Sequence, residues 1–418
     1  MLTYNDLVYA GISNVIGAGI FVIISFVHKF ARSHTWLSVL FAGLFMSIFA
    51  EHYAKLPDII KNDKDIHLEY DVIKRITNDK TATGFILMAI IGLIFSTYLV
   101  SRSFGNYLSD YLPQINNRLG TLIIISICFL LNRYGVDIVA KWNNVILLFG
   151  LAILTLLIVI GFYRLFTDSA GYKFFKESTN LNGIKDNFFN IIKGAYMIIF
   201  SYVGFELLVK LNSDTENPQI DIPKAIRTTI IFTIIIYTLL GYVYSYAMYK
   251  KDLIKDNRSL ETNKSINLET KPINLETKPI NLETTQPINL ETKEIIYDIV
   301  TDKLKSNNDG APLTYAMEIL ANTKKINHIV SFGGMIFTAT TTLLMMLSAS
   351  KLLAGQLELS TNTKIKKLDS LNVVLIGILM LFATNIGIEK STVIANICII
   401  LLMIIVSYSV IRIRHSLI

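Results

Sequence analysis

Apolar segments long enough to cross a lipid bilayer recur along almost the whole chain. A transmembrane helix needs about 20 mainly apolar residues. Ten ranges approach or meet this length: 7–30, 36–52, 83–104, 119–132, 143–166, 188–211, 226–248, 326–353, 371–388 and 391–411. Only 17% of the 418 residues are charged, against about 25% in soluble domains. The sequence therefore predicts an all-α polytopic membrane protein with about ten transmembrane helices, surrounded by a lipid bilayer.

The first of these ranges contains an unusual polar and glycine-rich stretch. The sequence SNVIGAGIFV, which begins at Ser13, places two polar residues and two glycines in one half of the helix. Glycine destabilises a helix by about 1 kcal/mol relative to alanine, and lipid offers a freed backbone group no hydrogen-bond partner. We therefore expect the helix to be unwound around Gly17, Ala18 and Gly19.

The sixth range carries a second interruption, in the sequence GAYMIIFSYVGFELLVK. Gly204 lies at its centre, and Glu206 follows two residues later. A carboxylate inside the bilayer costs about 3 kcal/mol unless it faces a cavity or a partner. Interruptions in the first and sixth of ten ranges occupy corresponding positions in two five-helix halves. Such a pair is the best sequence indication of a transporter binding site at the bilayer midplane.

Two unwound segments of this kind can hold a zwitterion. The amides of residues 17–19 offer donors and the partial positive charge of a helix N-terminus to a carboxylate. Freed carbonyls around Phe200 to Val203 can accept hydrogen bonds from an ammonium group. A simpler interpretation is that the glycines only permit close helix packing. A dinucleotide-binding loop is a poor alternative, because no strand precedes the glycines. We predict substrate binding without enzymatic activity, cofactor or metal.

A tandem repeat separates the seventh and eighth ranges. Residues 266–294 contain near-perfect copies of a seven-residue unit, INLETKP, with proline at 272, 279 and 287. Proline costs about 3 kcal/mol inside a helix, which excludes a continuous coiled coil. We predict a polar, disordered loop over 249–325 that serves as a spacer or binds a partner. It divides the chain into helices 1–7 (1–248) and helices 8–10 with a short tail (326–418).

Charge and glycosylation signals indicate the orientation. With the N-terminus inside, the cytosolic segments carry more Lys and Arg than the short external loops, as the positive-inside rule requires. Asn257 and Asn263 are possible N-glycosylation sites in the long loop. We predict cytosolic termini and an external loop, in a membrane that the sequence does not specify. The net charge of +7 is therefore attributed to orientation and not to nucleic-acid binding. Cys128 and Cys398 lie inside predicted spans and are expected to be packing residues.

Several motifs together resemble those of the amino acid–polyamine–organocation (APC) superfamily of permeases. The first range contains VIGAGIF (15–21), the sixth contains FSYVGFE (200–206), and the following loop is DTENPQIDIPKAI (214–226). Shorter similarities are LNRYGVD at 131, AEHYAKLP at 50, APLTYA at 311 and SASKLLAGQ at 348. The resemblance covers roughly 1–250 and 310–413. It implies a five-plus-five inverted-repeat bundle, similar to the leucine transporter, in which broken helices 1 and 6 hold the substrate.

The same resemblance implies roles for individual residues. The substrate-binding set is Ile16, Gly17, Ala18, Gly19, Phe200, Ser201, Tyr202, Val203 and Gly204. In this set the first-helix glycines and alanine bind the carboxylate, Phe200 is an aromatic lid, and Ser201 and Tyr202 lie at the amine end. Glu206 is the candidate for coupling, because burial can change how readily a carboxyl group binds a proton.

A threonine cluster in the eighth range is a candidate cation site. In sodium-coupled relatives, hydroxyls of this helix help to bind the ion, which points to Thr338, Thr341 and Thr342. Threonine also commonly bonds to its own helix carbonyls, so packing is the competing interpretation.

Departures from the family pattern keep other functions open. Many members have twelve helices, whereas we predict ten. Gly150 stands where some proton-coupled members carry a lysine, and Lys351 replaces an arginine and loses its bidentate fork. A polyamine carrier would need several intramembrane acidic residues, and only Glu206 is found. A degenerate permease acting as a receptor or assembly partner would not need intact GAGIF and SYVGFE motifs. We therefore predict an amino acid transporter that works by alternating access, coupled to a proton or sodium.

Overall fold

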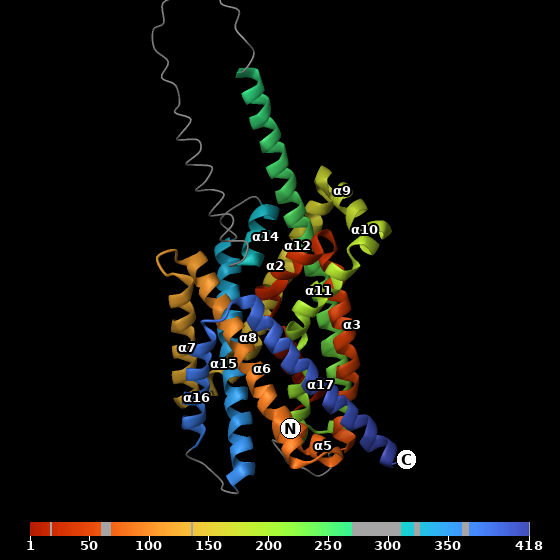
Figure 1. The fold of residues 1–418 in the computed structure, drawn as a ribbon, viewed down its shortest axis with the longest axis vertical. Helices are drawn as coiled ribbons and strands as arrows, with labels where there is room; N and C mark the ends of the chain where they lie inside the picture. The colour runs from red at the N-terminus through yellow and green to blue at the C-terminus, as the bar shows by residue number, and fades with distance from the viewer. Residues whose placement is uncertain are drawn as a thin grey trace, which may run out of the picture.

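The computed structural model describes residues 1–16, 19–59, 68–134, 137–269, 311–321, 327–361 and 368–417. In these ranges the chain forms an upright bundle of helices (Figure 1), and the only β-type pairing there is an isolated bridge between Leu2 and Thr215. The first half contains α1 (Tyr4–Val15), α2 (Gly19–Ala31), η1 (Arg32–His34), α3 (Thr35–Tyr53), α4 (Leu56–Ile59), α5 (Leu68–Ile76), α6 (Asp79–Tyr111), α7 (Asn117–Tyr134) and α8 (Asp137–Thr167). The remainder contains α9 (Ser169–Ser178), α10 (Leu181–Asp186), α11 (Phe188–Ile198), η2 (Ile199–Tyr202), η3 (Phe205–Asp214), α12 (Pro218–Glu269), α14 (Pro312–Ala321), α15 (Asn327–Thr361), α16 (Leu368–Ala383) and α17 (Ile388–Leu417).

Seven helical segments of the described chain are long and apolar enough to cross a membrane. They are Gly19–Ile59, Asp79–Tyr111, Leu147–Thr167, Phe188–Asn212, Pro218–Ile254, His328–Leu357 and Ile388–Ser416. The prediction of a multi-pass, all-α membrane protein is confirmed. Every predicted range overlaps a described helix, but the first two merge into one segment and α7 and α16 are short. The count of ten spans therefore stays a prediction.

Local sequence signals explain where several helices begin and turn. Thr3 and Asp6 form a reciprocal capping box at the start of α1, with Thr3 N donating to Asp6 Oδ2 over 2.9 Å. The Asn78 side chain caps α6 by accepting a hydrogen bond from Thr81 N at 2.9 Å. The chain turns from α2 into α3 at Arg32, whose φ of 50° is left-handed.

Corresponding helices of the two halves pack on one another. α2 contacts α11, α3 contacts α12, α6 contacts α15, and α7 contacts α16. The two members of each pair are counterparts in the two five-helix halves. They belong to the first and sixth, second and seventh, third and eighth, and fourth and ninth predicted ranges. This pairing is the arrangement expected of a five-plus-five inverted repeat.

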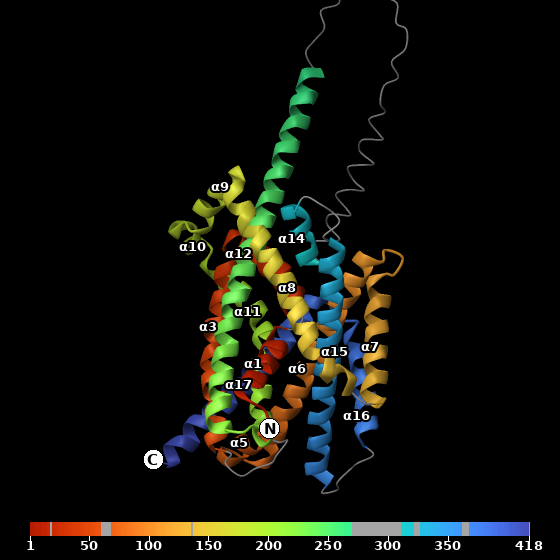
Figure 2. The same ribbon diagram turned by 180° about the vertical axis from the view of Figure 1, so that it is seen from behind.

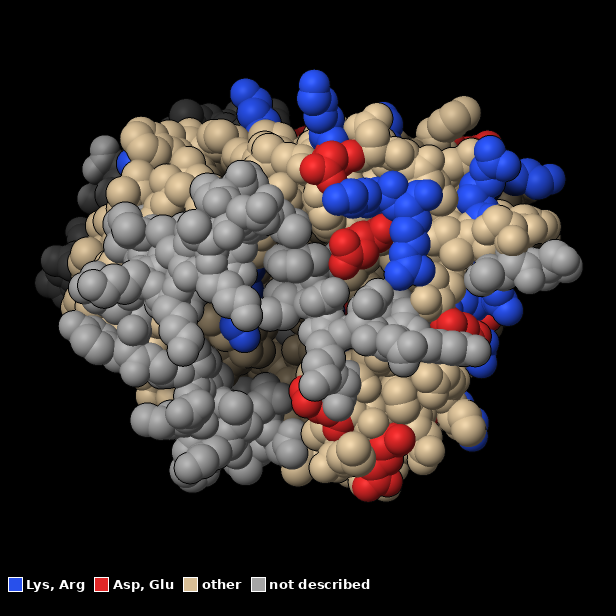
Figure 3. All heavy atoms as spheres, turned by 90° about the horizontal axis from the view of Figure 1, so that it is seen from below, with Lys and Arg blue, Asp and Glu red and all other residues tan. Residues whose placement is uncertain are grey.

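The two ends of the bundle differ. Both termini and α5 lie at one end, which we call the termini end, whereas α9, α10 and α14 lie at the other (Figures 1 and 2). Lys and Arg side chains gather on part of the termini face, interspersed with acidic ones (Figure 3). The opposite end is where α12 leaves the bundle.

Helix α12 is longer than predicted. It continues to Glu269, past the predicted end of the seventh span at 248, so that Asn257 and Asn263 lie in a helical segment. The physical reason is that residues 249–269 contain no proline and include several Lys, Arg and Glu residues, which are good helix formers. Of the repeat, 266–269 end α12 and 270–294 lie outside the described residues. Helix α14 also falls within the predicted loop.

Candidate functional site

Both predicted interruptions are present in the backbone. Helix α1 ends at Val15, Ile16 leaves the helical conformation with ψ 57°, and α2 begins at Gly19. Gly17 and Ala18 lie outside the described residues, so their contacts with a carboxylate stay a prediction. The sixth segment changes from α11 to the tighter η2, becomes extended at Val203 and reaches φ 131° at Gly204.

The two interruptions touch each other through their glycines. A Cβ atom added at Gly19 would lie 2.6 Å from the Cα atom of Ser201. A Cβ atom added at Gly204 would lie 2.7 Å from the carbonyl carbon of Asn14. Real Cβ atoms do not approach so closely, and the φ of Gly204 also disfavours other residues. Glycine at both positions is therefore required by the crossing of the two broken helices.

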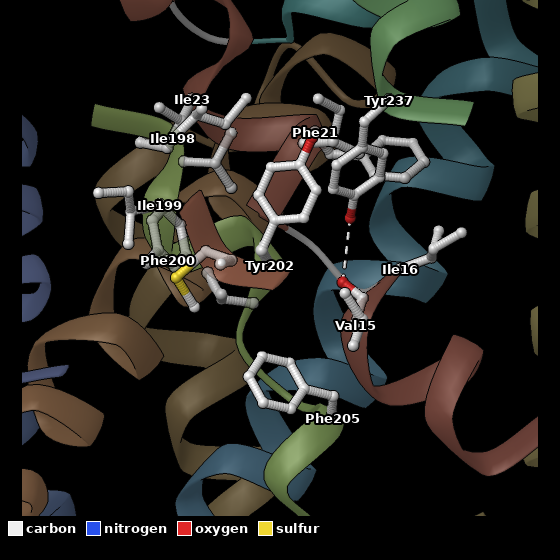
Figure 4. Packing of buried hydrophobic residues seen from close by; sticks show 14 of the residues in the cluster. Val15, Ile16, Phe21, Ile23, Ile198, Ile199, Phe200, Tyr202, Phe205 and Tyr237 are labelled. Atoms are coloured by element: carbon white, nitrogen blue, oxygen red, sulfur yellow. Dashed lines mark hydrogen bonds between the residues drawn. The ribbon is translucent and has the colours of Figure 1, made fainter. Parts of the chain in front are cut away.

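Aromatic side chains close the bundle beside the interruptions (Figure 4). Tyr237 donates a hydrogen bond from its hydroxyl to the carbonyl of Val15 at 3.0 Å, which satisfies an oxygen at the end of α1. Tyr202 donates to the carbonyl of Val39 in α3 at 2.9 Å, and its ring meets that of Tyr237 edge-on. Phe200 is also buried, in the same cluster. The Tyr202 hydroxyl is thus used in packing the scaffold.

Helix α17 completes the sixth-segment interruption through Asn396. Its side-chain carbonyl accepts from the backbone N–H of Phe200 at 3.1 Å, and its amide donates to the carbonyl of Tyr196 at 2.6 Å. These bonds satisfy backbone groups that the irregular helix leaves over. Sequence reasoning missed this residue. The available signal was a single amide side chain in the otherwise apolar run VIANICII.

Ser201 is the polar residue of the predicted set that lacks a partner. Its hydroxyl oxygen is buried and makes no hydrogen bond with any described residue. Most buried polar side-chain atoms in proteins are hydrogen-bonded. An unsatisfied hydroxyl at the contact of the two interruptions is compatible with a position where a solute supplies the bond.

The threonines of α15 show ordinary helical bonding. Thr338 donates to the carbonyl of Gly334 at 2.7 Å, and Thr342 donates to that of Thr338 at 2.7 Å. Thr341 instead lines the pocket described below. These bonds fit the packing interpretation, and the cation site stays a prediction. Groups of three or more His, Cys, Asp or Glu that could hold a metal are absent from the described ranges.

Gly150 makes room for an aromatic stack. A Cβ atom added at this position would overlap the Phe337 ring, which stacks on Phe21 of α2 with 5.3 Å between centroids. A lysine at position 150 would displace that stack. The presence of glycine instead of lysine at position 150 is therefore explained by the close packing of Phe337, which lies in the eighth predicted span.

A pocket reaches the interruptions from the termini end. It has a volume of ≈ 90 Å³, enough for several water molecules. Its polar lining comes from the end of α1, from α3, α5 and α15, and from η3: Ser13, Asn14, Tyr53, Glu69, Glu206, Lys210, Thr341 and Ser348. Leucine, methionine, alanine, valine and isoleucine side chains form most of the remaining wall. Gly204 connects this pocket to the unwound segment.

Glu206 lies between the interruption and the pocket. Its Oε2 atom accepts a hydrogen bond from the backbone N–H of Gly204 at 2.7 Å, and the side chain lines the pocket. The carboxylate thus stabilises the strained backbone of the interruption. Because the Glu206 side chain also lines the pocket, a ligand bound there would lie beside it.

The family model for amino acid permeases matches residues 2–266. The chain belongs to the amino acid permease family. The matched region contains both interruptions and reaches almost to the end of α12. Helices α14 to α17 follow it in the chain.

The permease shares limited identity with individual relatives. The inner membrane transport protein YbaT of Escherichia coli (strain K12) is 24% identical over 265 residues, which cover 62% of this chain and 56% of that protein. The aspartate-proton symporter of Bacillus subtilis (strain 168) is 28% identical over 136 residues, covering 32% and 24% respectively. The chain thus matches little more than half the length of the first relative. A manganese transporter of Eremococcus coleocola aligns over 99% of this chain and 96% of that chain at 11% identity, with a TM-score of 0.43.

Proposed function

We propose that this permease carries amino acids across a membrane by alternating access and holds them between its two broken helices. The observation that carries the proposal is the contact between the interruptions, where Gly19 meets Ser201 and Gly204 meets Asn14. Freed backbone groups of two chain segments converge there. The names of the two relatives, a membrane transport protein and an aspartate-proton symporter, support transport and an amino acid substrate.

The described conformation suits one stage of such a cycle. The pocket approaches the interruptions from the termini end, while the cluster around Phe21, Tyr202 and Tyr237 is buried on the side toward α2 and α11. A substrate bound at the interruptions would therefore exchange with the termini end. We place that end in the cytosol, since both termini lie there and its surface carries many Lys and Arg side chains (Figure 3).

Glu206 is the residue we propose for coupling. It is a carboxylate at the edge of the bound-substrate position, and it contacts the interruption through Gly204. Protonation of this group would weaken that contact and loosen the unwound segment. A proton is therefore the coupling ion that the geometry favours over sodium, for which the α15 threonines are the other candidates.

Uptake into liposomes tests the proposal. The purified chain should accumulate at least one labelled amino acid from a panel of twenty, and Gly19→Leu should abolish uptake because the larger side chain enters the Ser201 backbone. Gly84→Ala is the matched control, since nothing lies within 4 Å of a Cβ atom at that position. If no amino acid enters and only polyamines do, the carboxylate site is wrong. If nothing enters under any gradient, the chain is not a carrier.

A further inference from the structure

A charged cluster in the pocket has no role in the proposed binding of the substrate backbone. Glu69, on α5, is 4% exposed, and its Oε1 atom lies 3.3 Å from the ammonium of Lys210 on η3. The other oxygen, Oε2, is buried without a hydrogen-bond partner among the described residues. The hydroxyl of Tyr53 also has no hydrogen-bond partner among the described residues, and the Tyr53 side chain has no exposed surface. Two residues that line the pocket therefore each carry a buried polar atom without a partner. Buried polar atoms are usually hydrogen-bonded, and a ligand in the pocket would supply the missing bonds.

The formal charges of the pocket do not balance. Glu69 and Glu206 contribute two negative charges, and Lys210 contributes one positive charge. An unbalanced carboxylate in a low-dielectric surrounding is costly and attracts a cation. The cluster therefore favours a positively charged ligand near the free oxygen of Glu69.

The walls indicate which cation fits. No group of three or more acidic, histidine or cysteine residues suited to a metal occurs in the described part of the chain. Apolar side chains form most of the pocket wall, among them Leu93, Leu207, Leu344 and Met345, and Glu69 lines the same pocket. A mainly apolar pocket that contains a carboxylate suits an alkyl chain with a terminal ammonium, since methylene groups pack on apolar walls and the charge is paired.

We propose that this pocket binds the side-chain ammonium of a cationic amino acid, with Glu69 as its counter-ion and Tyr53 as a hydrogen-bonding neighbour. The inference rests on the proposed function, because the substrate backbone would be held at the interruptions. The same type of interaction is present within the protein, because the primary ammonium of Lys210 pairs with the other oxygen of the Glu69 carboxylate. Glu69 is thus a specificity-determining residue outside the unwound segments.

A matched pair of amino acids tests the proposal. Lysine and norleucine share the same carbon chain, and only lysine carries the terminal amine. Titration of the purified full-length chain by calorimetry should give a Kd for lysine at least about tenfold lower than for norleucine, as expected for a charge-assisted bond. In Glu69→Gln the ratio should fall close to one while norleucine affinity is kept. Lys210→Gln should raise the preference for lysine, because it frees the second oxygen.

Glu51→Gln is the control variant. Glu51 is also an acidic residue near the termini end, but it pairs with Arg227 at 2.8 Å on an exposed surface and does not line the pocket. Its substitution should leave the ratio unchanged. Retention of norleucine binding in Glu69→Gln shows that the variant is folded and that the interruptions still bind an amino acid.

The other outcomes are separable. An unchanged lysine-to-norleucine ratio in Glu69→Gln overturns the ammonium site and leaves the proposed function standing. Binding of neither amino acid by the unaltered chain overturns both. If 1,5-diaminopentane binds as well as lysine and depends on Glu69 but not on Gly19, the ammonium site is supported and the amino acid proposal fails.

Discussion

Gly19 of α2 and Ser201 of η2 lie in direct contact, with no space for a Cβ atom between them. The contact joins the start of one half-helix to the end of another across 182 residues of sequence. A larger residue at position 19 would therefore have to displace the second interruption.

Gly19→Ala should destabilise the protein and reduce uptake. The new methyl group would meet backbone atoms of Ser201, which cannot rotate away, and overpacking of this kind costs about 1–3 kcal/mol. Thermal unfolding in detergent measures the loss. Gly84→Ala, at an open helical position, should be neutral or slightly stabilising. Equal melting temperatures for both variants would show that the interruptions are not tightly packed.

Asn396→Ala should be destabilising although the residue is remote in sequence from the site. The substitution leaves the N–H of Phe200 without its bond to Asn396 and removes one of two bonds to the carbonyl of Tyr196, which keeps the bond from Ile199 N. An unsatisfied buried group costs about 1–3 kcal/mol. The same unfolding measurement applies, with Asn385→Ala as the control because Asn385 is exposed. If the two variants melt together, Asn396 is not the support of the sixth-segment interruption.

Glu206→Gln should alter the pH dependence of transport. Glutamine can still accept the bond from Gly204 N, so the fold should be retained, but it cannot exchange a proton. Uptake driven by an imposed pH gradient should fall at least about tenfold, while exchange of labelled for unlabelled substrate should persist. A variant that follows the gradient like the parent would remove Glu206 from the coupling mechanism.

Asp168, at the junction of α8 and α9, should make stability pH-dependent. Burial raises the pKa of its carboxyl group, but hydrogen bonds from Lys250 at 2.6 Å and Tyr246 at 3.1 Å outweigh burial, and the pKa is lowered overall. A carboxyl group with a lowered pKa stabilises the folded state at neutral pH, and this contribution is lost as pH falls through the folded-state pKa.

The expected result is a pH-dependent difference between Asp168→Asn and the parent chain. The variant should be less stable by about 1–3 kcal/mol at pH 7. The difference should shrink below about pH 4, where Asp168 is protonated in the unfolded chain, and should be lost as pH falls through the lower folded-state pKa. Melting curves recorded from pH 7 to pH 3 measure this. A constant difference across that range would contradict the assignment.

Part of this architecture could be read from the chain. The glycines at 17, 19 and 204 predict interruptions, because glycine weakens a helix and a backbone group freed there finds no hydrogen-bond partner in lipid. In the structure α1 ends at Val15 and α2 begins at Gly19, and the sixth segment breaks at Gly204. The roles of Tyr237 and Asn396, which satisfy the freed backbone groups, could not be assigned from the sequence, since their partners are about 200 residues away. Glu69 and Lys210 were likewise invisible as a pair. In the sequence Glu69 lies in a charged segment between two predicted spans, and only the folded structure brings α5 and η3 close enough for the 3.3 Å contact between Glu69 and Lys210.

The short pairing of Leu2 with the chain after η3 has a mechanical consequence. Leu2 N donates to the carbonyl of Asp214 at 2.7 Å, and Glu216 N donates to the carbonyl of Leu2 at 3.2 Å. These two hydrogen bonds link the start of α1 to the end of η3. A rigid-body movement of either segment therefore displaces the other, unless the bonds break. A probe or tag attached before Thr3 would disturb both α1 and η3. Labels that must not perturb the transport cycle should therefore be placed elsewhere on the molecule.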